Sequence, residues 1–299
     1  MTDKNTEFQS NNLSFEKDAS TPLQKKIINV GGHIIDFQIP KVMGIVNVTP
    51  DSFFEGSRMK SEEHAVQTVE QMIGEGAVFI DLGAYSTRPG AAEVSEEEEI
   101  KRLVPVVKTL AKRFPEAILS IDTFRAKVAE ATVFEGAHLI NDISAGELDR
   151  RMIETVVRLK VPYVFMHMKG SPQTMTKLSQ YENVTNEVFS YLSAKIDQLR
   201  QAGITDLILD PGFGFAKTIE HNYQLLNQME IFRSFNVPVL AGLSRKTMIW
   251  KVLGIENKDA LNGTTVLNTV ALTKGADILR VHDVKPAMEA VTLINKMLR

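Results

Sequence analysis

The chain has no cysteine among its 299 residues, which excludes disulfide bonds, thiolate metal sites and a cysteine nucleophile. It also lacks any run that approaches the roughly 18 apolar residues of a membrane-spanning helix. Its first 24 residues are polar and contain no apolar core like that of a signal peptide. We therefore expect residues 1–24 to be a disordered tail and the protein to work in the cytoplasm, without a membrane partner.

Neither sign of charge dominates the composition, because 34 Lys and Arg face 37 Asp and Glu and leave a net charge of -3. Such a mildly acidic surface does not indicate nucleic acid as a partner. No pair of histidines has the spacing of a zinc site, and no Gly-x-Gly-x-x-Gly follows the first strand-like run. The sequence therefore gives no sign of a zinc centre or of dinucleotide binding.

Eight short apolar runs alternate with stretches of helical length. The runs cover residues 42–48, 78–82, 118–121, 138–141, 161–166, 206–209, 237–243 and 277–281. We expect helices at residues 61–74, 96–113, 125–135, 149–159, 183–202, 219–235, 246–253, 258–273 and 284–298. Eight βα units of this spacing predict an α/β fold, a (β/α)8 TIM barrel that forms one domain over residues 25–299.

Two features outside this alternation concern local structure. Gly31-Gly32 separates two short alternating runs and predicts a hairpin that would plug the lower end of the barrel. Ser95 with Glu98 three residues later predicts the start of a helix. The acidic run at residues 96–99 then lies in the first helical turn, where carboxylates favour the helix dipole, so we interpret it as structural.

The apolar runs end repeatedly in polar residues that can do chemistry, which is typical of the catalytic face of a barrel. The loops after the first and second runs, at residues 49–60 and 83–94, are long and are expected to act as lids on that face.

Arg280 and His282 are two positions apart on the last run, so both side chains point to the same side. Together they predict an anion site, and the alternative is a purely structural ion pair between Arg280 and a neighbouring carboxylate. Asn47 ends the first run, where an amide is equally suited to cap a turn or to bind Mg²⁺ beside substrate phosphates. The predicted anion site favours the interpretation of Asn47 as a metal ligand.

Four further strand-end groups offer donors and acceptors suited to a flat heterocycle. They are Asp122, Asn141, Asp210 and Lys246. A structural ion-pair network is the alternative, since buried charges require partners. Phe215, in the glycine-rich loop after Asp210, would wall an aromatic substrate or merely pack, and His167 is interpreted as structural.

Seven segments together resemble the dihydropteroate synthase family. They are Met43 to Phe53, Ser86-Thr87-Arg88-Pro89-Gly90, Ile121-Asp122-Thr123, Ile140-Asn141-Asp142, Asp210-Pro211-Gly212-Phe213-Gly214, Gly242-Leu243-Ser244-Arg245-Lys246 and Arg280-Val281-His282. The resemblance implies a transferase of folate biosynthesis, the target of sulfonamides. It would join p-aminobenzoate to 6-hydroxymethyl-7,8-dihydropterin pyrophosphate with Mg²⁺ as cofactor, and it would form a homodimer through barrel helices.

The resemblance also implies a role for individual residues. The pterin would be held by Asp122, Asn141, Asp210 and Lys246, with Met166 and Gly242 lining its slot. The pyrophosphate would be held by Asn47, Arg280 and His282, with Asn47 also binding the metal. The p-aminobenzoate pocket would be shaped by Thr87, Arg88, Pro89, Phe53 and Phe215, with Thr247 near the carboxylate. The groups expected to act in catalysis are Asn47, Lys246, Arg280 and His282, with Asp51 or Glu55 stabilising a pterin cation in a dissociative substitution.

Both lid loops depart from the family pattern. Glu55 and Ser57 stand where the family commonly has Asp and a Gly, and Ala84-Tyr85 replaces the common Gly-Glu. Three other functions remain open from the sequence: a methyltetrahydrofolate-binding methyltransferase, a catalytically inactive pterin-binding relative, and an unrelated phosphosugar barrel.

Overall fold

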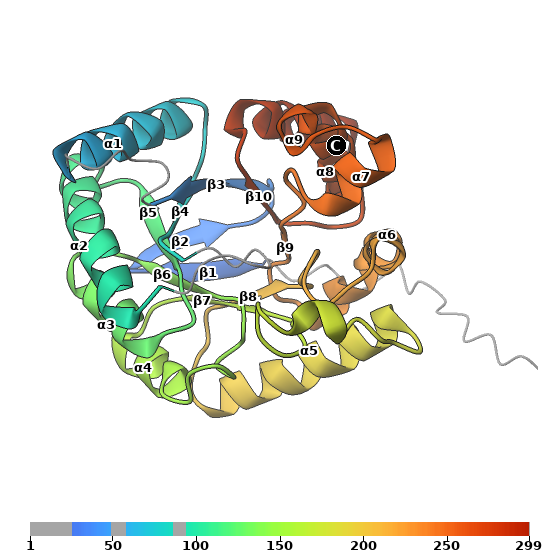
Figure 1. The fold of residues 1–299 in the computed structure, drawn as a ribbon, viewed down its shortest axis with the longest axis horizontal. Coiled ribbons are helices and arrows are strands. Elements are labelled where there is room, and N and C mark those ends of the chain that lie inside the picture. The colour runs from blue at the N-terminus through green and yellow to red at the C-terminus, as the bar shows by residue number, and fades with distance from the viewer. Residues whose placement is uncertain (1–25, 49–57, 86–93, 299) are drawn as a thin grey trace, which may run out of the picture.

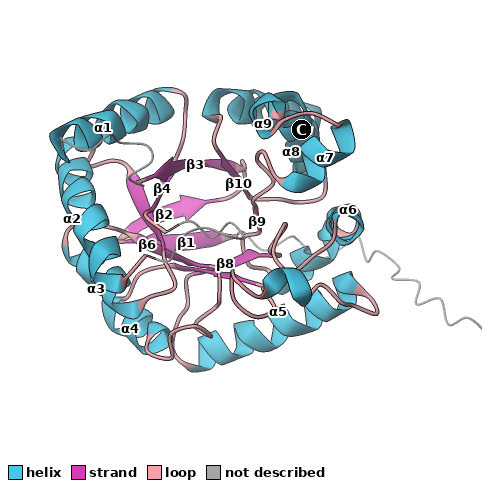
Figure 2. Cartoon of the chain, viewed as in Figure 1, coloured by secondary structure: helices cyan, strands magenta, loops and turns pink. Residues whose placement is uncertain are grey.

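Parallel strands form the centre of the molecule (Figures 1 and 2). The computed structural model describes residues 26–48, 58–85 and 94–298. In this part of the chain the central sheet has eight strands in the order β8-β7-β6-β5-β4-β3-β10-β9. A parallel bridge between Leu209 and Val239 brings β8 beside β9 and nearly closes the ring. The strands are β3 (Lys41–Asn47), β4 (Phe79–Gly83), β5 (Ile118–Asp122), β6 (Leu139–Asp142), β7 (Tyr163–Met166), β8 (Leu207–Asp210), β9 (Leu240–Ala241) and β10 (Ile278–Val281).

Helices follow the strands and form an outer ring around them (Figure 1). They are α1 (Arg58–Gly74), α2 (Glu96–Arg113), α3 (Ala126–Phe134), α4 (Met152–Leu159), α5 (Val184–Gln201), α6 (Ile219–Asn227), α7 (Thr247–Leu253), α8 (Leu261–Thr273) and α9 (Val284–Leu298). Short 3-10 helices occur at Met175–Lys177, Met229–Phe235 and Asn257–Asp259. The TIM barrel predicted from the eight alternations is confirmed. None of the described helices is long and apolar enough to cross a membrane.

A hairpin of β1 (Ile27–Val30) and β2 (His33–Asp36) lies across one end of the barrel (Figure 1). Gly31 and Gly32 both have positive φ, which the tight turn requires. Beneath the hairpin, one apolar side chain from each barrel strand joins a buried cluster with the hairpin residues. This cluster contains Ile28, Val30, Phe37, Met43, Phe79, Ile118, Leu139, Val164, Ile208, Leu240 and Ile278. The predicted hairpin and its plugging role are therefore confirmed.

Two side-chain contacts tie the hairpin to the barrel. The Lys26 ammonium donates to Asp277 at 2.6 Å, just before β10, and the Asn29 N–H donates to Asp206 at 2.7 Å, just before β8. These two strands flank β9, where the barrel has its shortest strand. The hairpin is thus fastened on both sides of the weakest part of the ring.

Two predicted elements differ most from the structure. The helix expected over residues 219–235 ends at Asn227 and continues as a 3-10 helix. The strand expected over residues 237–243 is reduced to Leu240–Ala241. In that segment the Val239 N–H donates to the Asp277 carboxylate at 2.8 Å, so a side chain takes the place of a ladder partner.

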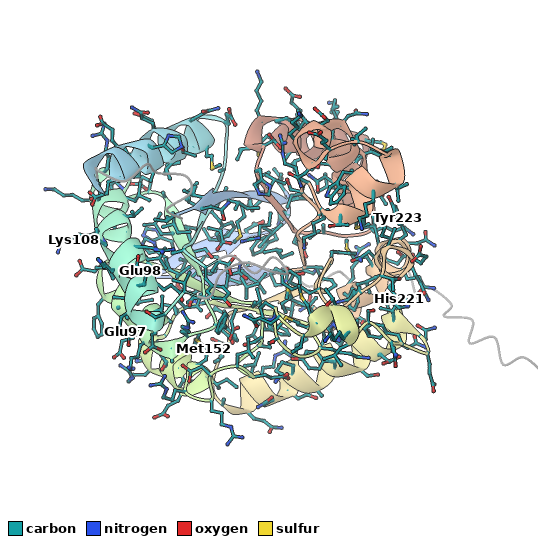
Figure 3. All side chains as sticks on the ribbon, in the orientation of Figure 1. Glu97, Glu98, Lys108, Met152, His221 and Tyr223 are labelled. Atoms are coloured by element: carbon teal, nitrogen blue, oxygen red, sulfur yellow. The ribbon has the colours of Figure 1, made fainter. Side chains whose placement is uncertain are left out.

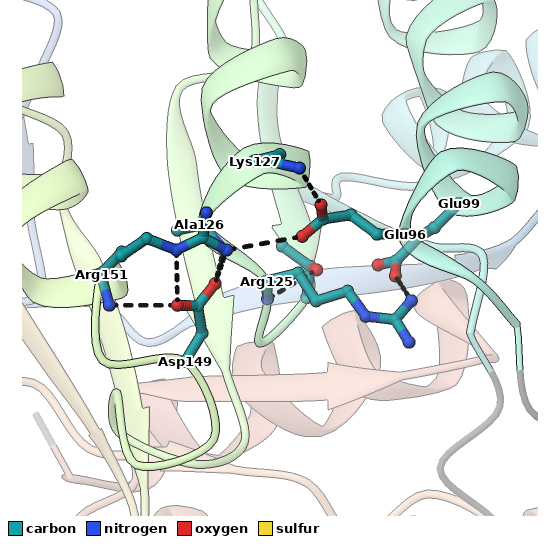
Figure 4. A network of polar contacts seen from close by, with 8 residues as sticks. Glu96, Glu99, Arg125, Ala126, Lys127, Asp149 and Arg151 are labelled. Atoms are coloured by element: carbon teal, nitrogen blue, oxygen red, sulfur yellow. Dashed lines mark hydrogen bonds and ion pairs between the residues drawn. The ribbon is translucent and has the colours of Figure 1, made fainter.

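The acidic start of α2 is a structural network (Figure 4). Ser95 caps the helix by accepting from the Glu98 N–H, as predicted. Glu96 pairs with Lys127 at 2.9 Å, and Glu99 pairs with Arg125 at 2.6 Å. The carboxylates therefore fasten α2 to the start of α3. Figure 3 shows Glu97 and Glu98 at this end of α2, with Lys108 directed outwards farther along the helix.

Candidate active site

The alternation of side chains along each strand places the site. Each barrel strand contributes one apolar side chain to the buried cluster beneath the hairpin. Because side chains two positions apart share a face of a strand, the residues two positions after these also point into the barrel. Those residues are Ile45, Asp81, Ser120, Asn141, Met166, Asp210, Gly242 and Arg280. The carboxyl half of the barrel interior is thus lined largely with polar groups.

Arg280 lies at the centre of a buried network. Its Nε donates to Asp81 Oδ2 at 2.6 Å and its Nη2 donates to Asp122 Oδ2 at 2.6 Å. Asp81 is completely buried and also accepts from Asn141 Nδ2 at 2.9 Å and from Ser120 Oγ at 2.5 Å. One guanidinium therefore links residues of β4, β5 and β6 to β10.

The network shifts the pKa values of its members. Burial raises the pKa of Asp122 to about 7, against the opposing effect of Arg280 and with a further rise from Asp81. For Arg280, burial disfavours the charge, but Asp81 and Asp122 outweigh it and raise the pKa above its ordinary value. Arg280 hence stays charged, whereas Asp122 changes charge near neutral pH.

Lys246 and Asp210 lie on the opposite side of the barrel mouth, beside Gly242. A Cβ at Gly242 would lie 3.7 Å from Lys246 Nζ and 3.9 Å from Asp210 Oδ2, so glycine keeps this space open. Lys246 Nζ donates to the Phe213 carbonyl and lies 4.9 Å from the centre of the Phe215 ring. Burial lowers the pKa of Lys246 to about 8, against the effect of Asp210.

A second lysine, Lys217, lies under the turn that follows β8. Its Nζ donates to the Gly212 carbonyl at 2.8 Å and the Phe215 carbonyl at 3.1 Å, and it lies 3.0 Å from His167 Nδ1. Burial, followed by Lys217 and Lys169, lowers the pKa of His167 to about 2. The imidazole is therefore neutral and accepts from Lys217, in agreement with the structural interpretation of His167.

The remaining predicted residues that the structure describes lie at the ends of the strands or just after them. Asn47 is exposed at the end of β3, in register with Gly83, which is itself in register with Asp122. His282 Nδ1 lies 3.0 Å from Ser244 Oγ. Thr247 is exposed at the first position of α7. Met166 is buried in an apolar cluster against which Phe215 packs.

Six predicted residues lie outside the described part of the chain. They are Asp51, Phe53, Glu55, Thr87, Arg88 and Pro89. Their proposed roles stay predictions.

Sequence reasoning missed three of the groups that organise this site: Asp81, Ser120 and Lys217. Asp81 and Ser120 lie inside apolar runs and not at their ends, although their two-residue spacing from Phe79 and Ile118 marks them as inward-facing. Lys217 lies in a loop, and no periodicity indicates that its ammonium turns inwards.

No cluster of three or more His, Asp or Glu residues able to hold a metal occurs in residues 26–48, 58–85 and 94–298. What these residues do provide is a set of inward-facing carboxylates, an amide and an ammonium, with a guanidinium and an imidazole at the edge. Such a set can hydrogen-bond the rim of a flat heterocycle and bind an anion beside it.

Known proteins are similar to this chain in sequence and in architecture. Residues 43–282 match the family described as pterin binding enzyme. The chain is 44% identical to the dihydropteroate synthase of Escherichia coli strain K12 over 269 residues, which cover 89% of this chain and 95% of that protein.

Two solved structures resemble the chain to the same degree. The dihydropteroate synthase of Yersinia pestis in complex with a sulfonamide drug is 40% identical, with a TM-score of 0.85 over 91% of this chain and 99% of that one. The dihydropteroate synthase of Xanthomonas albilineans with 4-aminobenzoic acid is 39% identical, with a TM-score of 0.85 over 92% of this chain and 98% of that one.

Proposed function

The chain belongs to the pterin binding enzyme family and within it to the dihydropteroate synthases, and we propose that the inward-facing polar cluster is where it catalyses that reaction. The reaction joins p-aminobenzoate to 6-hydroxymethyl-7,8-dihydropterin pyrophosphate and gives 7,8-dihydropteroate and pyrophosphate. The observation that carries the assignment of the site is the gathering of Asp122, Asn141, Asp210 and Lys246 at one end of the barrel, from four different strands or the loops that follow them.

The pterin is bound by its hydrogen-bonding edge. Asp122 and Asp210 accept from ring N–H and amino groups, and Lys246 donates to a ring oxygen or nitrogen. Asn141 donates through Nδ2 to Asp81, which fixes the orientation of its amide. The N–H groups of the ligand would add hydrogen bonds to both buried carboxylates and so offset the cost of the desolvation that raises their pKa values.

The diphosphate is bound at the other edge of the cluster by Arg280, His282 and Asn47. Arg280 Nη1 makes no hydrogen bond to another described residue, so it is the donor that reaches the anion. Arg280 Nε lies 2.6 Å from Asp81 Oδ2 and Nη2 lies 2.6 Å from Asp122 Oδ2, and these two contacts fix the plane of the guanidinium. Nη1 therefore points in one defined direction.

We propose that Mg²⁺ acts as the cofactor, held by Asn47 together with the substrate diphosphate. The donor set fits this ion, because Mg²⁺ takes few protein ligands when phosphates supply the others. The absence of an all-protein cluster from the described residues is compatible with such a shared site. When bound, the ion would neutralise charge on the departing pyrophosphate.

The chemical step is a dissociative substitution. The bond from the pterin methylene carbon to the diphosphate oxygen breaks and leaves a cation that the electron-rich ring stabilises. The arylamine nitrogen then forms the new bond and loses its proton to solvent. The neutral amine is already nucleophilic, so the reaction requires no strong base, and the protein supplies orientation and charge stabilisation. Asp51 or Glu55 would add to the stabilisation of the cation.

The arylamine pocket is proposed to lie beside Phe215 and Thr247, completed by Phe53, Thr87, Arg88 and Pro89. Phe215 packs against the apolar cluster that contains Met166, and Thr247 is exposed at the start of α7. A hydroxyl donor there suits the carboxylate of p-aminobenzoate.

The enzyme is proposed to work as a cytoplasmic homodimer. Large apolar side chains are exposed on three neighbouring helices, α7, α8 and α9. They are Val252, Leu253, Leu261, Val266, Leu293 and Met297. A second copy of the chain would cover such a surface. The charged diphosphate substrate crosses a bilayer poorly. We therefore propose that the enzyme works in the cytoplasm, in the same compartment in which its substrate is made.

The activity is tested by following pyrophosphate release and dihydropteroate formation with both substrates and Mg²⁺. We expect product that depends on p-aminobenzoate, a loss of at least about a hundredfold in kcat/KM for Arg280→Ala, and no change for Arg158→Ala, which removes a surface ion pair with Glu130. Tight binding of the pterin without product would instead indicate an inactive relative. Methyl transfer from methyltetrahydrofolate would indicate the methyltransferase.

A further inference from the structure

The turn that follows β8 is pressed against the end of β7. Gly212 has φ +76, and a Cβ there would lie 2.0 Å from the His167 carbonyl oxygen, so no side chain fits. Gly214, also at positive φ, donates through its N–H to Asn222 Oδ1 at 2.6 Å. The turn is therefore held at close range on both sides, and the Lys217 ammonium lies in the space beneath it.

Lys217 fills that space through a single nitrogen that makes four contacts. The three shorter ones are to the carbonyls of Gly212 and Phe215 and to the Nδ1 of the neutral His167, at 2.8, 3.1 and 3.0 Å, and the fourth is to the His167 carbonyl at 3.5 Å. An ammonium has three N–H groups, which are enough for the three shorter contacts. Burial lowers the pKa of Lys217 to about 7, with Asp210 opposing and Lys246 adding to the fall.

The turn that Lys217 holds also holds Lys246. The Phe213 carbonyl accepts from Lys246 Nζ, the Phe215 ring lies 4.9 Å from the same nitrogen, and a Cβ at Gly214 would lie 3.0 Å from Lys246 Cδ. The position of the Lys246 ammonium is thus set by the backbone between the two carbonyls that Lys217 binds.

We propose that Lys217 is a positioning residue that fixes Lys246 through this turn and so sets the affinity for the pterin. It touches no substrate itself. The inference rests on the proposed function only in taking the pterin pyrophosphate as the ligand that Lys246 contacts.

The first test compares Lys217→Met with Lys169→Met. Lys169 is a neighbouring lysine whose ammonium contacts Glu187, the Gln180 carbonyl and the Tyr181 ring, all outside residues 211–217. Calorimetric titration with 6-hydroxymethyl-7,8-dihydropterin pyrophosphate should show about tenfold weaker binding for Lys217→Met, since hydrogen bonds to a charged group are lost. Lys169→Met should bind within about twofold of the wild type.

The second test is a double-mutant cycle with Lys246→Met. If Lys217 acts through Lys246, the tenfold loss from Lys217→Met should shrink to less than about twofold when Lys246 is already absent. An equal loss in both backgrounds, or no loss in either, would overturn the inference. A wild-type protein that does not bind the pterin would instead refute the proposed function.

Circular dichroism melts show whether each variant is folded before its affinity is interpreted. Should Lys217→Met fail to fold, Lys217→Gln takes its place, since its amide keeps two N–H donors. We expect Lys217→Gln to bind the pterin about threefold more weakly than the wild type. If Lys217→Gln is folded, binds the pterin with wild-type affinity and shows no coupling to Lys246→Met, the proposal is wrong.

Discussion

Replacing Asp81 with asparagine tests whether the buried network is held by charge. The change keeps the shape of the side chain but removes one of the two carboxylates that flank Arg280. Removing one partner of a buried ion pair typically costs about 3–5 kcal/mol. The asparagine oxygen still accepts from Arg280 or Asn141, so we expect a loss of stability near the lower limit, about 3 kcal/mol.

A loss of this size is measurable by thermal unfolding. An unfolding entropy of about 2.1 cal/mol/K per residue gives about 1.6 °C for each kcal/mol in a chain of 299 residues, so Asp81→Asn should melt about 5 °C below the wild type. The matched control is Asp197→Asn on the exposed face of α5, which should melt within about 2 °C of the wild type. A difference of under about 2 °C between the two variants would refute the view that charge on Asp81 holds the network.

The same variant has a second signature in its pH dependence. Asp81 raises the pKa of Asp122, so its removal should lower that pKa. Pterin binding needs the Asp122 carboxylate, and in Asp81→Asn this binding should persist to a lower pH than in the wild type. Binding titrations of both proteins across pH 5–8 measure the shift. If affinity is lost at the same pH in Asp81→Asn and in the wild type, the two carboxylates do not interact.

Three further outcomes are expected. The affinity of the wild type for the pterin pyrophosphate should fall below about pH 7, as Asp122 gains a proton, and above about pH 8, as Lys246 loses one. In fluorescence titrations, Asp122→Asn should not show the loss of affinity at low pH. Asn47→Ala should raise the Mg²⁺ concentration for half-maximal activity by about tenfold, as loss of an ion ligand implies, and an unchanged Mg²⁺ titration would place the ion elsewhere. Val266→Glu and Leu293→Glu should each convert a dimer to monomers in sedimentation velocity, while a monomeric wild type would contradict the proposed interface.

The fold was predictable because its signal repeats. Eight apolar runs separated by helical stretches leave few arrangements other than a closed parallel sheet, and the Gly31-Gly32 turn is specified by two adjacent residues with positive φ. Predictions that rested on one local pattern were less exact. The last part of the helix over 219–235 became a 3-10 helix, and the strand over 237–243 lost its N-terminal part because the Asp277 side chain, far along the chain, takes the Val239 N–H.

For the site, sequence reasoning located the polar strand ends but not their connections. Asp122, Asn141 and Arg280 were expected to contact a ligand, and the structure shows that they also contact one another or Asp81. Counting two residues onward from the inward apolar layer would have found Asp81. Lys217 would have stayed hidden, because which way a loop lysine turns depends on acceptors contributed by a different strand.

The hairpin that seals the barrel has a consequence for the order in which the protein can be made. Lys26 contacts Asp277 across 251 positions, so a ribosome exposes the hairpin long before its partner exists. Until the last strand emerges, the apolar side chains of Ile28 and Val30 have no complete ring to cover. These apolar side chains of the nascent chain therefore lack their final packing partners through nearly all of its synthesis. Final closure is a contact of high sequence separation, and such contacts form late.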